Sequence, residues 1–145
     1  MSGNRGDTAS SPTACFHWPL RVYWEDTDAG GVVFYANYLR FFERARTEWL
    51  RALGVSQQAL REQEAVLFVV SETQVQYLLP ARLDDALSVS VELLERGRAS
   101  LLIAQEARRG DTVLARGRMR IGCVDAGNFR PRRIPNPVMD ILPHP

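Results

Sequence analysis

The apolar residues of the chain follow a helical period first and a strand period afterwards. Between positions 39 and 53 they recur at steps of three, four and seven: Leu39, Phe42, Trp49, Leu50 and Leu53. Charged residues fill most of the positions between them, so this spacing predicts an amphipathic helix of about four turns. Gly54 follows directly and suits the left-handed residue with which many helices end.

From residue 66 onward apolar and polar residues alternate, which is typical of strands with one buried face. The sequence predicts four strands in this part, over residues 68–77, 87–93, 101–107 and 113–123. Pro80 ends the first of them, because proline cannot continue a strand ladder. Gly110 and Asp111 indicate a tight hairpin between the last two.

The segment before the helix predicts another strand. Phe16 to Trp24 is rich in aromatic and β-branched residues, with Val22 and Trp24 on the same side. After the helix, Ser56 can cap a short second helix that runs to Glu62. One long helix against about five antiparallel strands is an α+β layer architecture, in which the sheet curls around the helix. The outer face of the sheet is then solvated or buried by a partner subunit.

The two ends of the chain differ from its middle. Residues 1–14 are small and polar, and we expect a disordered leader there. Residues 15–135 contain the elements of one folded domain. The proline- and arginine-rich segment that begins at Asn128 predicts irregular structure, which includes a tail over residues 136–145.

Composition excludes several classes of function. The formal net charge of the 145 residues is +1, which gives no global electrostatic case for nucleic acid. No apolar run is long enough for a membrane span, and the N-terminus lacks the layout of a secretory signal. Cys15 and Cys123 show no metal-ligand spacing. The alternatives are a disulfide and two buried thiols in a reducing cytoplasm, and we expect the thiols.

The chemistry-bearing residues gather in an acidic loop just before the long helix. Asp28 is followed by Gly30 and Gly31, which permit close backbone approach by a ligand. A carboxylate beside a helix start can attack, or activate water toward, a carbonyl whose oxygen the free N–H groups polarise. The alternative is that Asp28 is an Asx-turn residue only. Glu25 and Asp26 are rival carboxylates that we expect to cap the loop or stay solvated.

Other chemistries find less support in the sequence. The spacing of the loop does not fit a calcium site, since Asn37 occupies the position of the terminal Glu, so no metal is expected. No G-x-S-x-G motif is present, and neither histidine is placed as a general base. Two groups of arginines are either solvated or bind an anion such as phosphate: Arg116, Arg118 and Arg120 on the last strand, and Arg130, Arg132 and Arg133 in the tail.

Two segments carry a resemblance to a known family. They read EDTDAGGVVFYANYLRFFERARTEWLRALG and, after a gap, FVVSETQVQYLLPARLDD. The chain resembles the hotdog-fold acyl-CoA thioesterases of the 4-hydroxybenzoyl-CoA thioesterase type, and is most similar to the Tol-Pal-associated acyl-CoA thioesterase branch. The resemblance covers roughly residues 19–135, and its D-x-D-x-x-G-x-V-x-x-x-x-Y pattern is specific.

The resemblance implies a long helix wrapped by a strongly curved antiparallel sheet. It implies subunits that pair edge to edge, often as a dimer of dimers (a homotetramer), with active sites at the subunit interface. It also implies roles for three residues: Asp28 as nucleophile or general base, the Tyr35 amide as oxyanion donor, and Gly31 for close approach. Further residues would contact the substrate: Val33, Phe34, Asn37, Tyr38, and the basic tail with Arg130, Arg132 and Arg133 at the phosphates of CoA.

The implied activity is hydrolysis of an acyl-CoA by a cytoplasmic enzyme, with CoA as part of the substrate and no separate cofactor. One residue departs from the closest branch, which commonly has His where this chain has Tyr35. Two alternatives stay open, namely hydrolysis of acyl groups on acyl carrier protein and binding of acyl-CoA without cleavage. A hotdog dehydratase fits less well because its usual histidine has no counterpart here.

Overall fold

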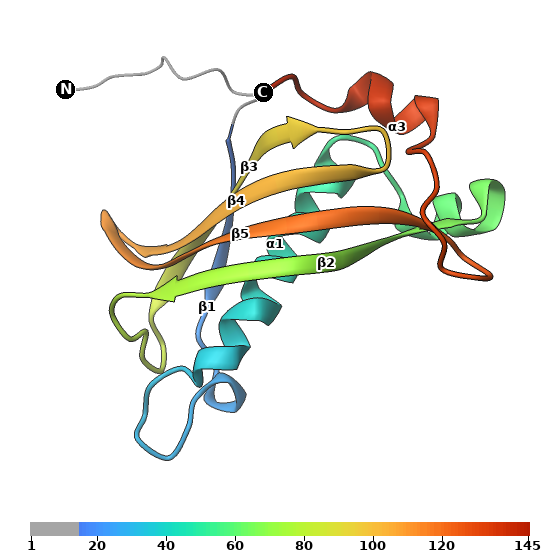
Figure 1. The fold of residues 1–145 in the computed structure, drawn as a ribbon. Helices are drawn as coiled ribbons and strands as arrows, with labels where there is room; N and C mark the ends of the chain where they lie inside the picture. The colour runs from blue at the N-terminus through green and yellow to red at the C-terminus, as the bar shows by residue number, and fades with distance from the viewer. Residues whose placement is uncertain (1–14) are drawn as a thin grey trace.

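A five-stranded antiparallel sheet forms the body of the protein. The computed structural model describes residues 15–145, so the expected leader lies outside the described part. The strands lie in the order β1-β3-β4-β5-β2 (Figure 1). Their bounds are β1 Phe16–Arg21, β3 Ala86–Arg96, β4 Ser100–Arg109, β5 Thr112–Asp125 and β2 Val66–Tyr77. The predicted strand count and antiparallel pairing are therefore confirmed.

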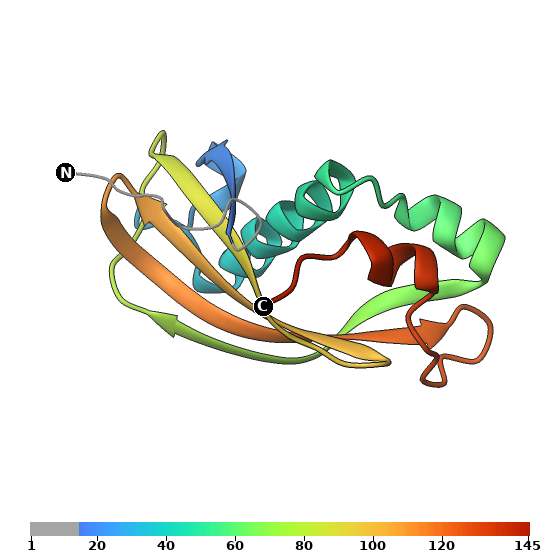
Figure 2. The same ribbon diagram turned by 90° about the horizontal axis from the view of Figure 1, so that it is seen from above.

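The long helix α1 (Tyr38–Ala52) lies in the concave side of this sheet (Figure 2). Phe41 and Phe42 are fully buried and Trp49 is nearly so, and all three side chains lie in the core. Leu39, however, is 43% exposed, contrary to the predicted face. The helical face that contains Phe42 and Trp49 passes through positions 38 and 45, so Leu39 falls on the solvent side.

The helix ends as its sequence predicts. Gly54 has a φ of +94°, and its N–H donates to the Arg51 carbonyl over 3.0 Å. The N–H of Val55 reaches back to the Leu50 carbonyl over 2.9 Å, which completes a Schellman motif. The Ser56 hydroxyl then accepts from the Ala59 N–H. It caps α2 (Gln57–Ala59), which continues as the single π-helical turn η3 (Leu60–Glu64).

The first strand is shorter than expected. It stops at Arg21 and the chain turns into a short 3₁₀ helix, η1 (Trp24–Asp26), so the predicted extension to Trp24 was wrong. Val22 is still fully buried, but Trp24 is 80% exposed. The turn forms because the N–H of Val22 donates to the Asp85 carbonyl, while Asp26 binds the backbone of Tyr23.

The tail contains a helix where irregular structure was expected. This short helix, α3 (Asn136–Ile141), follows Ile134, and both Ile134 and Val138 are buried in the core. The guanidinium of Arg96 donates to the carbonyl of Met139 over 2.8 Å and to that of Leu142 over 3.2 Å. These tertiary contacts hold a segment whose proline content alone favours a loop.

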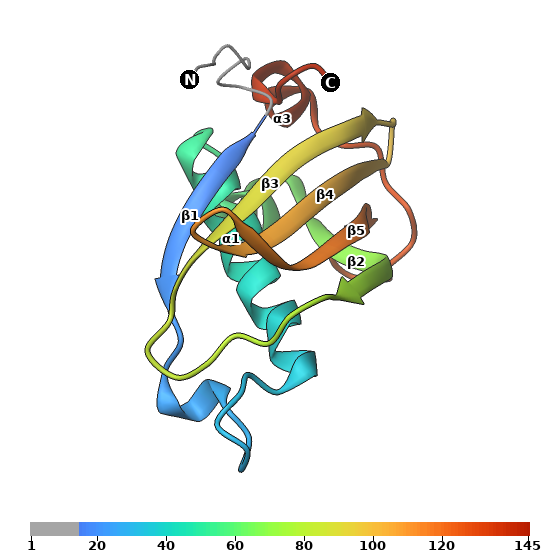
Figure 3. The same cartoon turned by 90° about the vertical axis from the view of Figure 1, so that its left-hand side faces the viewer.

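Two consequences of this architecture matter for function. The helix α1 packs mainly against β1, β3 and β4, which leaves the concave side of β5 and β2 less covered (Figure 3). Within the described residues β2 pairs only with β5, so its other edge is open. No helix in this part of the chain is long and apolar enough to cross a membrane.

Candidate active site

The acidic loop is a short hairpin that presents Asp28 at its turn. The Asp28 N–H donates to the Val32 carbonyl, and the Gly31 N–H donates to the Asp28 carbonyl. Gly31 has a φ of +81°, a conformation that glycine adopts without steric cost. The Asp28 carboxylate accepts the Gly30 N–H at Oδ1 over 2.8 Å and is exposed to solvent. Asp28 is therefore an Asx-turn residue whose Oδ2 accepts no hydrogen bond within residues 15–145.

Asp26 has a different environment although it is only two residues away. Its side chain is 3% exposed, and Oδ2 accepts the N–H of Tyr23 over 2.8 Å. Oδ1 accepts the Asn37 side-chain amide over 2.8 Å, and the Asp26 carbonyl accepts the Phe34 N–H. Asp26 thus fixes the loop to the helix start, as expected of a capping residue, and leaves Asp28 as the more accessible carboxylate.

The helix start lies directly behind the hairpin. The 3₁₀ turn η2 (Tyr35–Asn37) runs without a break into α1, so Tyr35 is the first residue of a continuous helical segment. The N–H groups of Tyr35 and Ala36 have no intrahelical acceptor at this position. The positive end of the helix dipole therefore faces the loop that holds Asp28.

A shallow hollow of about 420 Å³ joins the loop to this helix start. Its lining includes Asp28, Phe34, Ala36, Asn37 and Arg40. Arg40 is the one cation of this lining and was not predicted as a site residue. The helical period puts Arg40 among the charged residues between the apolar ones, and only its position in the first turn of α1 indicates a link to the loop.

The other predicted lining residues support the loop from behind. Val33 is buried, and its N–H donates to the Ala81 carbonyl. The Tyr38 hydroxyl accepts the Ala81 N–H over 3.0 Å, and burial raises the pKa of this phenol. The Tyr35 ring is 63% exposed and meets the edge of Tyr77, with ring centroids 5.9 Å apart. These contacts tie the loop to the end of β2.

The tail arginines lie at the opposite end of the molecule from Asp28. The chain around Arg130 and Arg132 runs beside Asp125, which pairs with Val66 at the start of β2. The whole length of β2, about 36 Å at ~3.3 Å per residue, separates that end from Tyr77. Within one chain the tail arginines therefore do not reach Asp28.

One of the tail arginines already has a partner. Arg132 forms a 2.8 Å ion pair with Asp125. The pKa of the Asp125 carboxyl is lowered by the backbone N–H groups of Gly127 and Asn128 and by Arg132. Arg130 and Arg133 are exposed and form no ion pair within the described residues.

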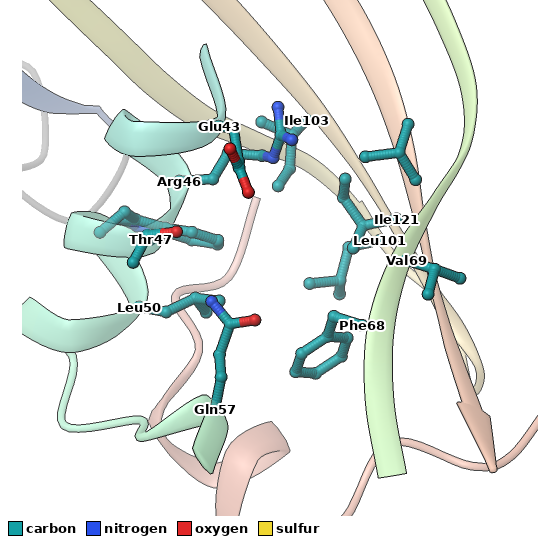
Figure 4. A pocket seen from close by; sticks show the side chains of 12 residues that line it. Glu43, Arg46, Thr47, Leu50, Gln57, Phe68, Val69, Leu101, Ile103 and Ile121 are labelled. Atoms are coloured by element: carbon teal, nitrogen blue, oxygen red, sulfur yellow. The ribbon is translucent and has the colours of Figure 1, made fainter. Parts of the chain in front are cut away.

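A second cavity, of about 290 Å³, lies between α1 and the open half of the sheet (Figure 4). It could not be predicted from the sequence, because its walls come from five separate elements, namely α1, α2, β2, β4 and β5. Among residues 15–145 no group of three or more His, Cys, Asp or Glu side chains is placed to hold a metal ion.

Comparison with known proteins places these features in a family. Residues 22–142 match the model of the thioesterase-like superfamily. The acyl-CoA thioesterase YbgC of Haemophilus influenzae is 44% identical over 129 residues, which are 89% of this chain and 95% of that protein. The acyl-CoA thioester hydrolase YbgC of Escherichia coli O157:H7 is 45% identical over 128 residues, covering 88% and 95%.

Solved structures agree with the fold. A hypothetical protein from Aquifex aeolicus superposes with a TM-score of 0.82 at 29% identity, covering 88% of this chain and 99% of that one. A 4-hydroxybenzoyl-CoA thioesterase variant in complex with 4-hydroxybenzoyl-CoA gives a TM-score of 0.81 at 18% identity, covering 90% and 99%. The second likeness concerns the fold alone.

Proposed function

We propose the following function from the premise that the chain belongs to the thioesterase-like superfamily and has the hotdog fold. The protein is an acyl-CoA thioester hydrolase, which converts an acyl-CoA and water to a carboxylic acid and free CoA. The observation that carries this function is the near full-length similarity to acyl-CoA thioesterases, with Asp28 exposed in a hollow that the helix start also lines.

Asp28 provides the carboxylate for the reaction. Either Oδ2 attacks the thioester carbonyl carbon, or it takes a proton from a water molecule that attacks the same carbon. The C–S bond then breaks and the CoA thiolate leaves. If Oδ2 has attacked, the acyl group remains on Asp28 as a mixed anhydride, which a water molecule hydrolyses to the carboxylic acid and the free carboxylate. If water has attacked, the carboxylic acid forms directly and the proton held by Asp28 passes to the thiolate. The Gly30 N–H holds Oδ1, which fixes the orientation of the carboxylate toward the hollow.

The Tyr35 amide stabilises the negative charge that develops on the carbonyl oxygen. It lies at the start of the helix, where the N–H has no intrahelical acceptor and the dipole adds positive potential. One such donor contributes about 10²–10³ to the rate of acyl transfer. Because a carboxylate, water and this donor supply all the required groups, the mechanism needs no metal or redox cofactor.

A second copy of the chain completes the site. Pairing of two β2 edges in antiparallel fashion would extend the sheet across a dimer and satisfy the open edge. This arrangement brings the end of β2 near Tyr77 next to the start of the partner's β2. Arg130 and Arg133 of the partner subunit then approach the loop with Asp28, where they bind the phosphates of CoA. The dimer, or a dimer of such dimers, acts in the cytoplasm, where CoA esters are its substrates.

Two alternatives to acyl-CoA hydrolysis are hydrolysis of acyl groups on acyl carrier protein and binding of acyl-CoA without cleavage. An acyl carrier protein presents the same thioester on an acidic surface, and the same arginines would meet it. A binding module that does not cleave acyl-CoA has no need of Asp28 in an open, oriented position.

Thiol release from a panel of acyl-CoAs tests the function directly. Wild-type protein should release CoA, and Asp28→Asn should lose at least 100-fold in kcat while it still folds and binds. Glu25→Gln is the matched control, because Glu25 lines the same hollow. Absence of turnover by the wild type on every CoA ester would exclude this function and leave acyl carrier protein substrates as the next test.

A further inference from the structure

The loop that follows β5 carries a large apolar side chain in an unfavourable backbone conformation. Phe129 has a φ of +60°, and its side chain is 62% exposed. Two other non-glycine residues among residues 15–145 have a positive φ, and both of them, Ala65 and Asp84, have smaller side chains. A positive φ is uncommon outside glycine, asparagine and aspartate, and for a bulky residue it is strained.

Burial does not account for the conformation of Phe129. An exposed ring gains little from the hydrophobic core, and glycine or asparagine would adopt the same φ at a lower cost. A single exposed apolar residue is common on protein surfaces. An exposed ring that the backbone holds under strain is not common, and such strain is found most often at ligand sites, where the surrounding structure enforces it.

The hydrogen bonds of the loop enforce this conformation. The Phe129 N–H donates to the Asp125 carbonyl over 2.9 Å, and the Asp125 N–H donates to the Arg130 carbonyl over 2.8 Å. Asp125 Oδ1 accepts the N–H groups of Gly127 and Asn128. Asn128 Oδ1 accepts the Arg130 N–H over 2.9 Å. The loop therefore presents the ring from a rigid base at the end of β5 (Figure 1).

Two arginines without an ion pair in the described part of the chain lie close to Phe129 in sequence. Arg130 follows it directly and Arg133 belongs to the same segment, and both are exposed. Arg132, in contrast, is paired with Asp125 at 2.8 Å. An exposed aromatic ring can stack on a planar base, and guanidinium groups form charge-assisted hydrogen bonds with phosphate. A ligand that combines a base with phosphate groups is a nucleotide.

We propose that Phe129 stacks on the adenine ring of the CoA nucleotide, beside the phosphates that Arg130 and Arg133 bind. The inference rests on the proposed function and names the carrier of the acyl group. CoA ends in an adenine nucleotide, whereas the phosphopantetheine arm of an acyl carrier protein has no base. Phe129 therefore selects acyl-CoA over acyl carrier protein as the substrate.

Titration with fragments of the nucleotide tests the stacking without turnover. Adenosine 3′,5′-bisphosphate carries the base and two phosphates, whereas inorganic pyrophosphate carries phosphates alone. Phe129→Asn should bind adenosine 3′,5′-bisphosphate about tenfold more weakly than wild type, because the stacking of a base on an aromatic ring contributes on that order. Its affinity for pyrophosphate should stay unchanged. Phe129→Trp keeps an aromatic face and should bind the nucleotide at least as tightly as wild type.

The stability of Phe129→Asn separates the loss of the ring from damage to the loop. Asparagine suits the left-handed conformation better than phenylalanine does, so the urea midpoint of this variant should equal or exceed that of wild type. Ile141→Asn is the matched control, because it removes another exposed apolar side chain from the tail. It should bind both ligands as wild type does.

Steady-state kinetics test the choice of carrier. Phe129→Asn should raise KM for acyl-CoA about tenfold and leave kcat unchanged. KM for the same acyl group on acyl carrier protein or on N-acetylcysteamine should not change, because neither carries a base.

Unchanged affinity for adenosine 3′,5′-bisphosphate in folded Phe129→Asn would overturn the proposal, and so would an equal loss of affinity for pyrophosphate. In either case turnover of acyl-CoA by wild type would uphold the thioesterase. Absence of wild-type turnover on every CoA ester would instead reject the proposed function, and with it the role of Phe129 in substrate selection.

Discussion

Asn37 donates a hydrogen bond from its side-chain nitrogen to Oδ1 of Asp26 over 2.8 Å. This bond joins the helix start to the buried end of the acidic loop, which also carries Asp28. The position of the proposed nucleophile relative to the Tyr35 amide therefore depends on a carboxylate that takes no part in the chemistry.

Asp26→Ala should destabilise the protein and lower its activity. The change leaves the Tyr23 N–H and the Asn37 amide without an acceptor in a buried place, which costs about 2–3 kcal/mol. Urea unfolding measures the loss, and thiol release measures the drop in kcat. Glu25→Ala, an exposed neighbour, should change the free energy of unfolding by less than about 0.5 kcal/mol. Equal stability of the two variants would contradict the anchoring role of Asp26.

Gly54→Ala should destabilise the end of α1 through the backbone alone. A Cβ at Gly54 meets no atom within 4 Å, but the φ of +94° disfavours any side chain. We expect a loss of about 1–2 kcal/mol. Gly122→Ala is the control, because its added Cβ also has space, with the nearest atom at 3.9 Å, and its φ is not positive. A loss at Gly122 as large as that at Gly54 would contradict this explanation.

The double change Arg130→Ala and Arg133→Ala should raise KM for acyl-CoA about tenfold or more, because each arginine offers charge-assisted hydrogen bonds to phosphate. The kcat should change little. KM for the N-acetylcysteamine thioester of the same acid, which lacks the nucleotide, should not change. Arg116→Ala, on the outer face of β5, is the control. An equal rise in KM for both substrates would show that these arginines do not bind the phosphates.

Asp125→Asn should remove a contribution to stability that depends on pH. The folded-state pKa of Asp125 lies below its ordinary value of 3.8, so its charged form is favoured by folding. That contribution is fully present above pH 4 and is lost as the pH falls through the folded-state pKa. Wild type should therefore be more stable than Asp125→Asn at pH 7, and the difference should shrink toward pH 3. Urea unfolding at both pH values measures it, and a difference that grew on acidification would contradict the prediction.

The spacing of apolar residues along the sequence correctly predicted the helices and strands whose buried side chains recur at a regular interval. The alternation of Leu87, Val89 and Val91 placed β3 correctly, because each of these side chains is buried against the helix. The same reasoning was wrong at Trp24, because the chain turns there. The turn depends on backbone hydrogen bonds to Asp85 and Asp26, which the spacing of apolar residues does not reveal.

The loop of the candidate site was predictable because its carboxylates, glycines and helix start are neighbours in sequence. The cavity between α1 and the sheet was not predictable, because Arg46 and Gln105, which are hydrogen-bonded beside it, are 59 residues apart. Their contact arises only when the sheet closes over the helix.

The open edge of β2 has a consequence for how the protein matures. A newly folded protomer exposes a 12-residue strand whose backbone can pair with any other extended chain. In the proposed dimer, pairing of two such edges is a bimolecular step that competes with aggregation through the same edge. Refolding yield should accordingly pass through a maximum as concentration rises, limited by encounter in dilute solution and by precipitation in concentrated solution.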